Sequence, residues 1–151
     1  MKMTKDVFVH IFSVHMEKDA EDGQENDTIE VIVPGTYYLK NGKHYILYEE
    51  VEENGKVTKN QLKVFEDGHV EIRKSGVLNA HMIFETGRKH FSSYRTPFGQ
   101  IQVAMNTGVV KVAERLQDFV VEIDYELEVN REPLTDCRIE IRVTPRQSRA
   151  K

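Results

Sequence analysis

The chain has 151 residues, a formal net charge of −4 and an isoelectric point near 5.9. This length favours a single domain that can bury its own core without a structural metal or disulfide. The acidic balance argues against nucleic-acid binding, because phosphate contacts need a basic face. Cys137 has no cysteine partner in the chain, which fits a reducing compartment, and we therefore predict a cytoplasmic location.

The N-terminal stretch, residues 1–16, has two early lysines followed by an apolar segment. Asp6, His10 and His15 interrupt that segment, and no small-x-small cleavage site follows, so we expect no signal peptide. No apolar run approaches the roughly 18 residues of a transmembrane helix, so no membrane contact is expected. Residues 16–27 are acidic and are expected to form a solvated loop.

Short glycine dipeptides divide the middle of the chain into hairpins. Asn41-Gly42, Asn54-Gly55 and Asp67-Gly68 favour tight hairpin turns, because type I′ turns need positive φ at both central residues. Thr86-Gly87 and Thr107-Gly108 indicate two further turns. This spacing predicts a series of sequential antiparallel strands.

The turn at Asn54-Gly55 determines which side chains of its hairpin face inward. A two-residue loop places Glu49 opposite Asn60 and Val51 opposite Thr58, on the more apolar face, which also carries Tyr45. A buried carboxylate is costly unless it is paired or hydrogen-bonded. The group Glu49, Thr58 and Asn60 is therefore either a polar site inside the fold or an exposed cluster near the turn.

The next turn, Asp67-Gly68, leaves the position of Arg73 open. A two-residue loop turns Arg73 inward, where it could pair with Glu49. A three-residue loop with a bulge at Gly68 turns Val70 and Ile72 inward instead. The second register buries apolar groups and is the favoured one.

Residues 92–103, SSYRTPFGQIQV, contain a hairpin corner. Pro97 presets φ for the first central turn position, and Gly99 supplies a residue that tolerates positive φ. The corner is expected to join residues 88–96 to residues 100–107. It does not explain Tyr94, which is expected to be a packing residue with its hydroxyl at the rim.

The last third of the chain alternates most clearly between apolar and polar residues. In residues 119–129, FVVEIDYELEV, the odd positions are apolar and the even ones from Glu122 are acidic, which predicts a strand with one buried face. Residues 137–143, CRIEIRV, repeat the pattern and make Cys137 a core residue. Residues 109–119 are the nearest approach to a helix, but their β-branched start makes a strand at least equally favoured.

About nine or ten sequential strands have to manage their edges, and closure into a barrel removes the edges altogether. The prediction is an all-β fold, a single antiparallel up-and-down barrel of eight to ten strands over residues 1–145, with a basic tail at residues 146–151. No phosphate-binding, nucleophile-elbow or metal-ligand spacing occurs, and the six histidines are scattered. No metal and no cofactor are predicted.

Several short pieces in this order resemble the YwiB-like proteins, a bacterial family of unknown function. They are GTYYLKNGKHYILYEE, IRKSG, MIFETG, YRTPFG and IDYELEVN. The resemblance implies a calycin-like barrel, related in shape to lipocalins and streptavidin, and implies no activity. The chain lacks tryptophan and so lacks the Gly-x-Trp signature of true lipocalins. The matching positions include Tyr48, Glu49, Thr58, Arg73, Gly76, Met82, Tyr94, Thr96, Pro97, Gly99 and Tyr125.

Three functional hypotheses follow from these features. The first is a small-molecule binding barrel, because a few convergent polar groups in an apolar cleft typify ligand sites. The second is a packed barrel that binds a protein partner through its surface, as a monomer or a dimer. The third and least favoured is an enzyme with Glu49 as general base and Arg73 as anion stabiliser. The predicted ligand-binding residues are Tyr45, Glu49, Thr58, Asn60, Arg73, Met82, Tyr94 and Tyr125.

Overall fold

The computed structural model describes residues 4–17 and 26–146, and every regular element in these ranges is a strand. No helix within these ranges is long and apolar enough to cross a membrane. The strands are β1 (Thr4–Glu17), β2 (Asn26–Lys40), β3 (Lys43–Val51), β4 (Val57–Val64), β5 (Val70–Gly76), β6 (Ala80–Phe84), β7 (Lys89–Thr96), β8 (Gly99–Glu114), β9 (Phe119–Val129) and β10 (Glu132–Pro145).

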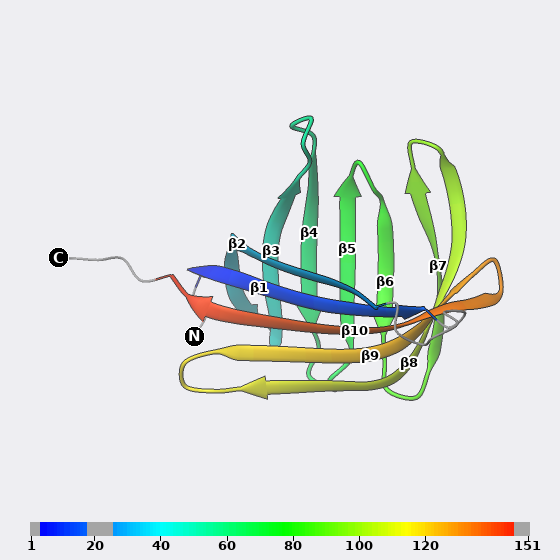
Figure 1. Cartoon of the computed structure of the whole chain (residues 1–151). Coiled ribbons are helices and arrows are strands. Elements are labelled where there is room, and N and C mark those ends of the chain that lie inside the picture. The colour runs from blue at the N-terminus through cyan, green and yellow to red at the C-terminus, as the bar shows by residue number, and fades with distance from the viewer. Residues whose placement is uncertain (1–3, 18–25, 147–151) are drawn as a thin grey trace.

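The strands form one ten-stranded antiparallel sheet in the order β6-β5-β4-β3-β2-β1-β10-β9-β8-β7. The first and last strands pair with each other, and the sheet curls until β6 meets β7 (Figure 1). Two backbone hydrogen bonds, of 2.9 and 2.8 Å, join Asn79 to Arg95 at that seam. The predicted up-and-down barrel is thus confirmed, in a nearly closed form.

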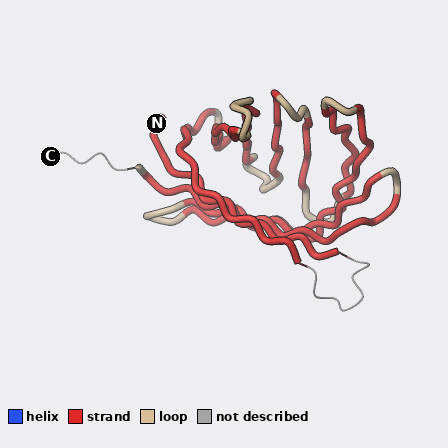
Figure 2. The backbone as a smooth tube through the Cα atoms, turned by 45° about the horizontal axis from the view of Figure 1, so that its top comes forward, coloured by secondary structure: helices blue, strands red, loops and turns tan. Residues whose placement is uncertain are grey.

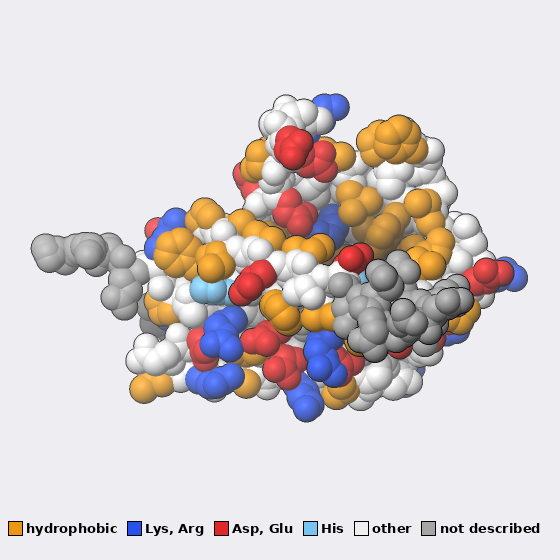
Figure 3. Space-filling model, in the orientation of Figure 1, with side chains coloured by type: hydrophobic (Ala, Val, Ile, Leu, Met, Phe, Trp, Pro, Cys, Tyr) orange, Lys and Arg blue, Asp and Glu red, His pale blue; other side chains and the backbone are white. Residues whose placement is uncertain are grey.

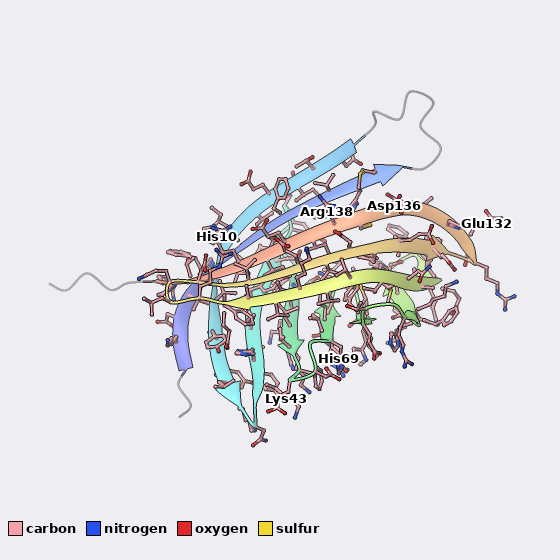
Figure 4. The ribbon with its side chains drawn as sticks, turned by 90° about the horizontal axis from the view of Figure 1, so that it is seen from below. His10, Lys43, His69, Glu132, Asp136 and Arg138 are labelled. Carbon is pink, nitrogen blue, oxygen red and sulfur yellow. The ribbon has the colours of Figure 1, made fainter. Side chains whose placement is uncertain are left out.

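The long strands cross one side of the barrel, and the shorter hairpins rise from them (Figure 2). The outer face of the long strands is charged on β9 and β10, whereas β1 exposes Phe8 and Phe12 there. Seen from below, Asp136 and Arg138 follow one another along β10, with His10 on the adjacent β1 (Figure 4). The Arg138 guanidinium donates to the Asp124 carboxylate across the sheet at 2.8 Å. The polar positions of the alternating pattern lie on the outer face, as predicted, except that Glu128 is buried and contacts Lys89 at 2.8 Å.

Turn chemistry explains where the register agrees with the prediction and where it does not. Asn41 and Gly42 have φ of 53° and 77° and form the expected two-residue loop between Lys40 and Lys43. At Asn54-Gly55, by contrast, Gly55 N–H donates to Glu52 C=O at 2.8 Å and only Gly55 has positive φ. Glu52 N–H also donates to Lys56 C=O at 2.9 Å, so the loop has three residues in place of the predicted two. Val51 therefore pairs with Val57, and the register of this hairpin moves by one residue.

Three other turn predictions had different outcomes. The Asp67-Gly68 hairpin takes the favoured bulged form, with Val70 opposite Val64 and both side chains buried. The turn predicted at Thr107-Gly108 is wrong, because β8 runs through it with a register shift between Thr107 and Val109. The predicted corner is confirmed, since Thr96 pairs with Gly99 around Pro97 and Phe98.

The barrel interior is filled by side chains from most of the strands. Cys137 is buried within it, as predicted. Residues 16 and 17 continue β1 and residues 26 and 27 begin β2, so the predicted acidic loop is shorter at both ends; residues 18–25 and the tail residues 147–151 lie outside the described ranges. The largest fully buried side chains are Phe84, Ile46, Leu62, Met105, Ile123, Ile141, Val9, Val64, Val70 and Val121.

Strands β2 and β3 diverge at one point in the barrel wall. Their pairing starts at Lys40 opposite Lys43 and ends at Gly35 opposite Tyr48. A Cβ atom at Gly35 would lie 2.6 Å from the Leu47 carbonyl oxygen, so glycine permits this close approach of the two backbones. Beyond it, residues 26–34 of β2 pair only with β1. The split opens the wall beside the end of the barrel that carries the candidate site.

Candidate functional site

Three polar side chains on neighbouring strands meet at the inner face near the β3–β4 hairpin. They are Glu50 on β3, Asn60 on β4 and Lys74 on β5. The Lys74 ammonium donates to Asn60 Oδ1 at 2.7 Å and to Glu50 Oε1 at 3.3 Å. Asn60 Nδ2 donates to the same Glu50 oxygen at 3.0 Å. The three groups form a closed network, which we call the mouth triad.

The mouth triad is graded in exposure from the interior to the solvent. Asn60 is only 2% exposed, the Lys74 side chain 17% and the Glu50 side chain 49%. A buried amide without partners would cost about 1–3 kcal/mol, so the two charged neighbours stabilise Asn60 where it lies. Burial first, and the Glu50 carboxylate second, raise the pKa of Tyr48 far above its ordinary value. Tyr48 is therefore a neutral hydroxyl beside the triad.

The opposite wall of the interior is aromatic and sulfur-containing. The Tyr94 hydroxyl lies 3.0 Å from the Met82 sulfur, and the Tyr125 ring packs on Phe84 with centroids 4.8 Å apart. Burial raises the pKa of Tyr94 to about 12 and raises the pKa of both Tyr125 and the Cys137 thiol. At neutral pH all three groups are uncharged, so this wall presents an apolar surface with hydroxyl groups and no thiolate nucleophile.

Open space lies at the mouth of the barrel, above the filled centre. A hollow of about 740 Å³ occupies the split between β2 and β3, with Val31, Val33, Tyr48 and Glu50 among its lining residues. A second, of about 580 Å³, lies between the tips of three hairpins, with Val57, Asn79 and Thr96 among its lining residues. Hydrophobic side chains gather above β1, in the hollowed region below the hairpin tips (Figure 3).

The structure brings five of the eight predicted site residues to the interior. Thr58 and Asn60 are buried on β4, Met82 is buried on β6, and Tyr94 and Tyr125 pack against the core. Their role in ligand binding stays a prediction. Polar side chains do face inward from β3 and β5, as considered, but they are Glu50 and Lys74, each one residue further along its strand than Glu49 and Arg73.

The other three predicted residues lie on the outer face, which corrects the predicted positions of Tyr45 and Glu49 and agrees with the favoured register for Arg73. Glu49 is opposite Lys59, because the longer loop at Asn54-Gly55 shifts the register and turns Glu50 inward in its place. Arg73 is exposed, and Lys74 points inward instead. Tyr45 stacks on Tyr38 at 4.7 Å, with the Lys63 ammonium 5.3 Å from its ring. Glu49 and Arg73 both line a hollow of about 330 Å³ on this outer face, away from the barrel interior. The enzyme hypothesis stays a prediction.

A second polar cluster lies at the other end of the barrel and was missed by the sequence interpretation. The Tyr37 hydroxyl lies 2.7 Å from His44 Nδ1, and His44 Nε2 lies 3.0 Å from the Glu114 carboxylate. The Phe119 ring packs on the imidazole with centroids 4.5 Å apart. The two-residue turn at Asn41-Gly42 places Tyr37 and His44 diagonally, which is a usable sequence signal. No such signal links them to Glu114.

Burial controls the charge state of this second cluster. Desolvation lowers the pKa of His44, opposed by the Glu114 carboxylate, and desolvation with the same carboxylate raises the pKa of Tyr37. The neutral imidazole fits both contacts when Nε2–H donates to Glu114 and Nδ1 accepts from the Tyr37 hydroxyl. Over residues 4–17 and 26–146, no group of three or more histidine, cysteine, aspartate or glutamate side chains could hold a metal ion.

Comparison with known proteins identifies the family. Residues 14–141 match the model of a domain of unknown function, DUF1934. The chain belongs to this family. A curated relative is the uncharacterised β-barrel protein YwiB of Bacillus subtilis (strain 168), which is 30% identical over 120 residues, covering 80% of this chain and 83% of the relative. The DUF1934 chain also has the fold of the YwiB crystal structure, with a TM-score of 0.82, 24% identity and coverage of 95% and 94% of the two chains.

Proposed function

We propose that this DUF1934 protein binds a small amphipathic molecule at the open mouth of its barrel. The observation that carries the proposal is the mouth triad, a hydrogen-bonded set of charged and polar groups directed into a mainly apolar interior. Ligand sites typically combine an apolar lining with a few polar groups that fix orientation. We also propose a cytoplasmic location for the protein.

The triad defines the chemistry of the ligand's polar end. The Lys74 ammonium is a donor and is 17% exposed, whereas the Glu50 carboxylate is an acceptor and is 49% exposed. A ligand that approaches from the mouth meets both charges. The apolar body of the ligand would lie against Val31, Val33 and the Tyr48 ring in the larger hollow. Hollows of about 740 and 580 Å³ are within the usual size range for small-molecule sites.

A fluorescence titration with anilinonaphthalene sulfonate tests this proposal, because the dye has an apolar body and an anionic end. We expect one saturable site per chain. Lys74→Met removes the charged donor and should weaken dye binding about tenfold or more, the effect of losing a charge-assisted hydrogen bond. Glu50→Gln removes a repelling charge and should strengthen it.

The matched control is Lys59→Met, which makes the same change on the outer face of β4. Lys59 is exposed and lies opposite Glu49, away from the interior. Equal dye affinity in the Lys74 and Lys59 variants would contradict the proposal. Near-ultraviolet circular dichroism of each variant separates a lost site from a lost fold.

A further inference from the structure

The split between β2 and β3 leaves a free sheet edge. Over Asn26–Pro34, β2 pairs with β1 in an unbroken register, and its other side has no partner strand among the described residues. A strand edge presents a row of unpaired backbone donors and acceptors, which is a template for another strand. The hollow of about 740 Å³ lies directly beside this edge.

The side chains on this edge are mostly apolar and unusually exposed. Ile29 is 49% exposed, Val31 37% and Ile32 59%. Protein edges are commonly protected by lysine, proline or a bulge. The segment has no lysine, its one proline is at the far end, and its pairing with β1 contains no register shift.

A second stretch of unpaired edge in the molecule is built differently. Residues 109–114 of β8 pair with β9 on one side only. This stretch includes Lys111, follows the register shift at Thr107, and ends at Glu114, which contacts His44. The comparison shows that the fold protects one exposed edge and leaves the other apolar and open.

We propose that the free edge of β2 pairs antiparallel with the same edge of a second copy of this chain. A two-fold axis through Val31 places Val31 opposite its own copy and Ile29 opposite Val33 of the second copy. The inner face of the junction is then entirely apolar. On the outer face Glu30 lies opposite Ile32 of the second copy, so no like charges are directly opposed.

The geometry of the split sets the length of the pairing. Gly35 is already paired with Tyr48, so the added strand cannot extend past Pro34. Symmetry about Val31 then gives a paired span of residues 28–34 in each copy. The inward row on β1 continues the same surface, since Ile11 lies beside Val31 and Ser13 beside Ile29. The second copy would add its own Ile29 and Val31 to the wall of the mouth.

The dimer would share Val31 and Val33 with the proposed ligand site, but it uses none of the triad and can be measured without a ligand. Sedimentation velocity of the full chain over a range of concentrations measures it directly. We expect a monomer–dimer equilibrium for the native protein. Val31→Lys opposes two lysines at the centre of the junction and should weaken the dimer about tenfold or more.

Val112→Lys is the matched control, because Val112 is also 37% exposed and lies on the other unpaired edge. It should leave the dimer unchanged. A native protein that stays monomeric at every concentration overturns the proposal. A dimer that survives Val31→Lys, or that is lost in Val112→Lys, also overturns it.

A crosslinking experiment covers the case in which the lysine variant does not fold. Residues opposed across an antiparallel pair have Cα atoms about 4.5–5.5 Å apart, which suits a disulfide. Under mild oxidation Val31→Cys should therefore form a covalent dimer, and Val112→Cys should not. Failure of a folded Val31→Cys variant to crosslink rejects the symmetric pairing.

Discussion

The two ends of the barrel carry polar clusters of similar size in different surroundings. The mouth triad joins charged Glu50 and Lys74 to buried Asn60, and a hollow lies beside it. At the other end, burial keeps His44 neutral between Tyr37 and Glu114, and the Phe119 ring covers it. The mouth triad places two charged groups at the larger hollow, of about 740 Å³. In the second cluster aromatic packing covers the imidazole, and the exposed Glu114 carboxylate lies at a smaller hollow, of about 400 Å³.

This difference separates a candidate site from a structural cluster. The charged groups of Glu50 and Lys74 remain partly solvated near an open apolar mouth. They can therefore exchange their present contacts for contacts with a ligand. A neutral imidazole with both nitrogens engaged and a ring packed on one face has little capacity left for a new partner. We therefore expect changes at the mouth to affect binding and changes at the closed end to affect stability.

The largest stability effect is expected from Phe119→Ala at the closed end. Phe119 is 7% exposed and its ring contacts both His44 and Tyr37. Truncating a buried phenylalanine typically costs about 3–5 kcal/mol through lost burial and the cavity left behind. Urea unfolding monitored by circular dichroism measures the change. Phe98→Ala, at a position that is 97% exposed, should leave the unfolding free energy nearly unchanged.

An intermediate effect is expected from Asn60→Leu at the mouth. The leucine removes the amide that links Lys74 to Glu50, although the two charged groups stay 3.3 Å apart. Leaving polar partners unsatisfied typically costs about 1–3 kcal/mol. Gln61→Leu, one residue along on the outer face, should change stability by less than about 0.5 kcal/mol. Equal losses in these two variants would mean that the triad contributes nothing specific.

The sequence predicted the class of fold because period-two alternation and glycine turns are local signals. Residues 119–129 alternate so regularly that the strand follows directly, and Phe119, Val121 and Ile123 are buried as the pattern requires. Glu128 departs from the pattern, since it is 8% exposed and contacts Lys89. The bulged turn at Asp67-Gly68 was also predictable, since only that register buries Val70 and Ile72. Strand number, order and the position of Cys137 all follow from such short-range information.

The candidate site was only partly predictable, because it depends on a turn whose dipeptide has two outcomes. Asn41-Gly42 forms a two-residue loop, whereas Asn54-Gly55 forms a longer one with positive φ at the glycine alone. A shift of one residue in the pairing of β3 with β4 places Glu50 on the inner face in place of Glu49. Packing against the rest of the sheet decides between these outcomes, and no local pattern in the hairpin itself contains that information.

The smallest expected effect is a dependence of stability on pH from the closed end. The pKa of His44 is lowered in the folded state, so below its ordinary value of 6.5 the unfolded chain binds the proton first. The contribution of His44 to stability is therefore complete above that pH and declines as the pH falls through it. Urea unfolding at pH 7.5 and pH 5.5 should show a loss on acidification that is smaller in His44→Phe, which keeps an aromatic ring on Phe119.

His81→Gln is the control for this measurement. His81 lies on the outer face with its Nε2 3.0 Å from Glu71, whose pKa is lowered partly by that contact. His81→Gln removes a histidine that lies outside the packed cluster and keeps a hydrogen-bonding side chain beside Glu71, so it should not reduce the loss on acidification. A His44→Phe protein with an undiminished difference would show that the imidazole is not held neutral by its packing, and the distinction between the two ends of the barrel would fail.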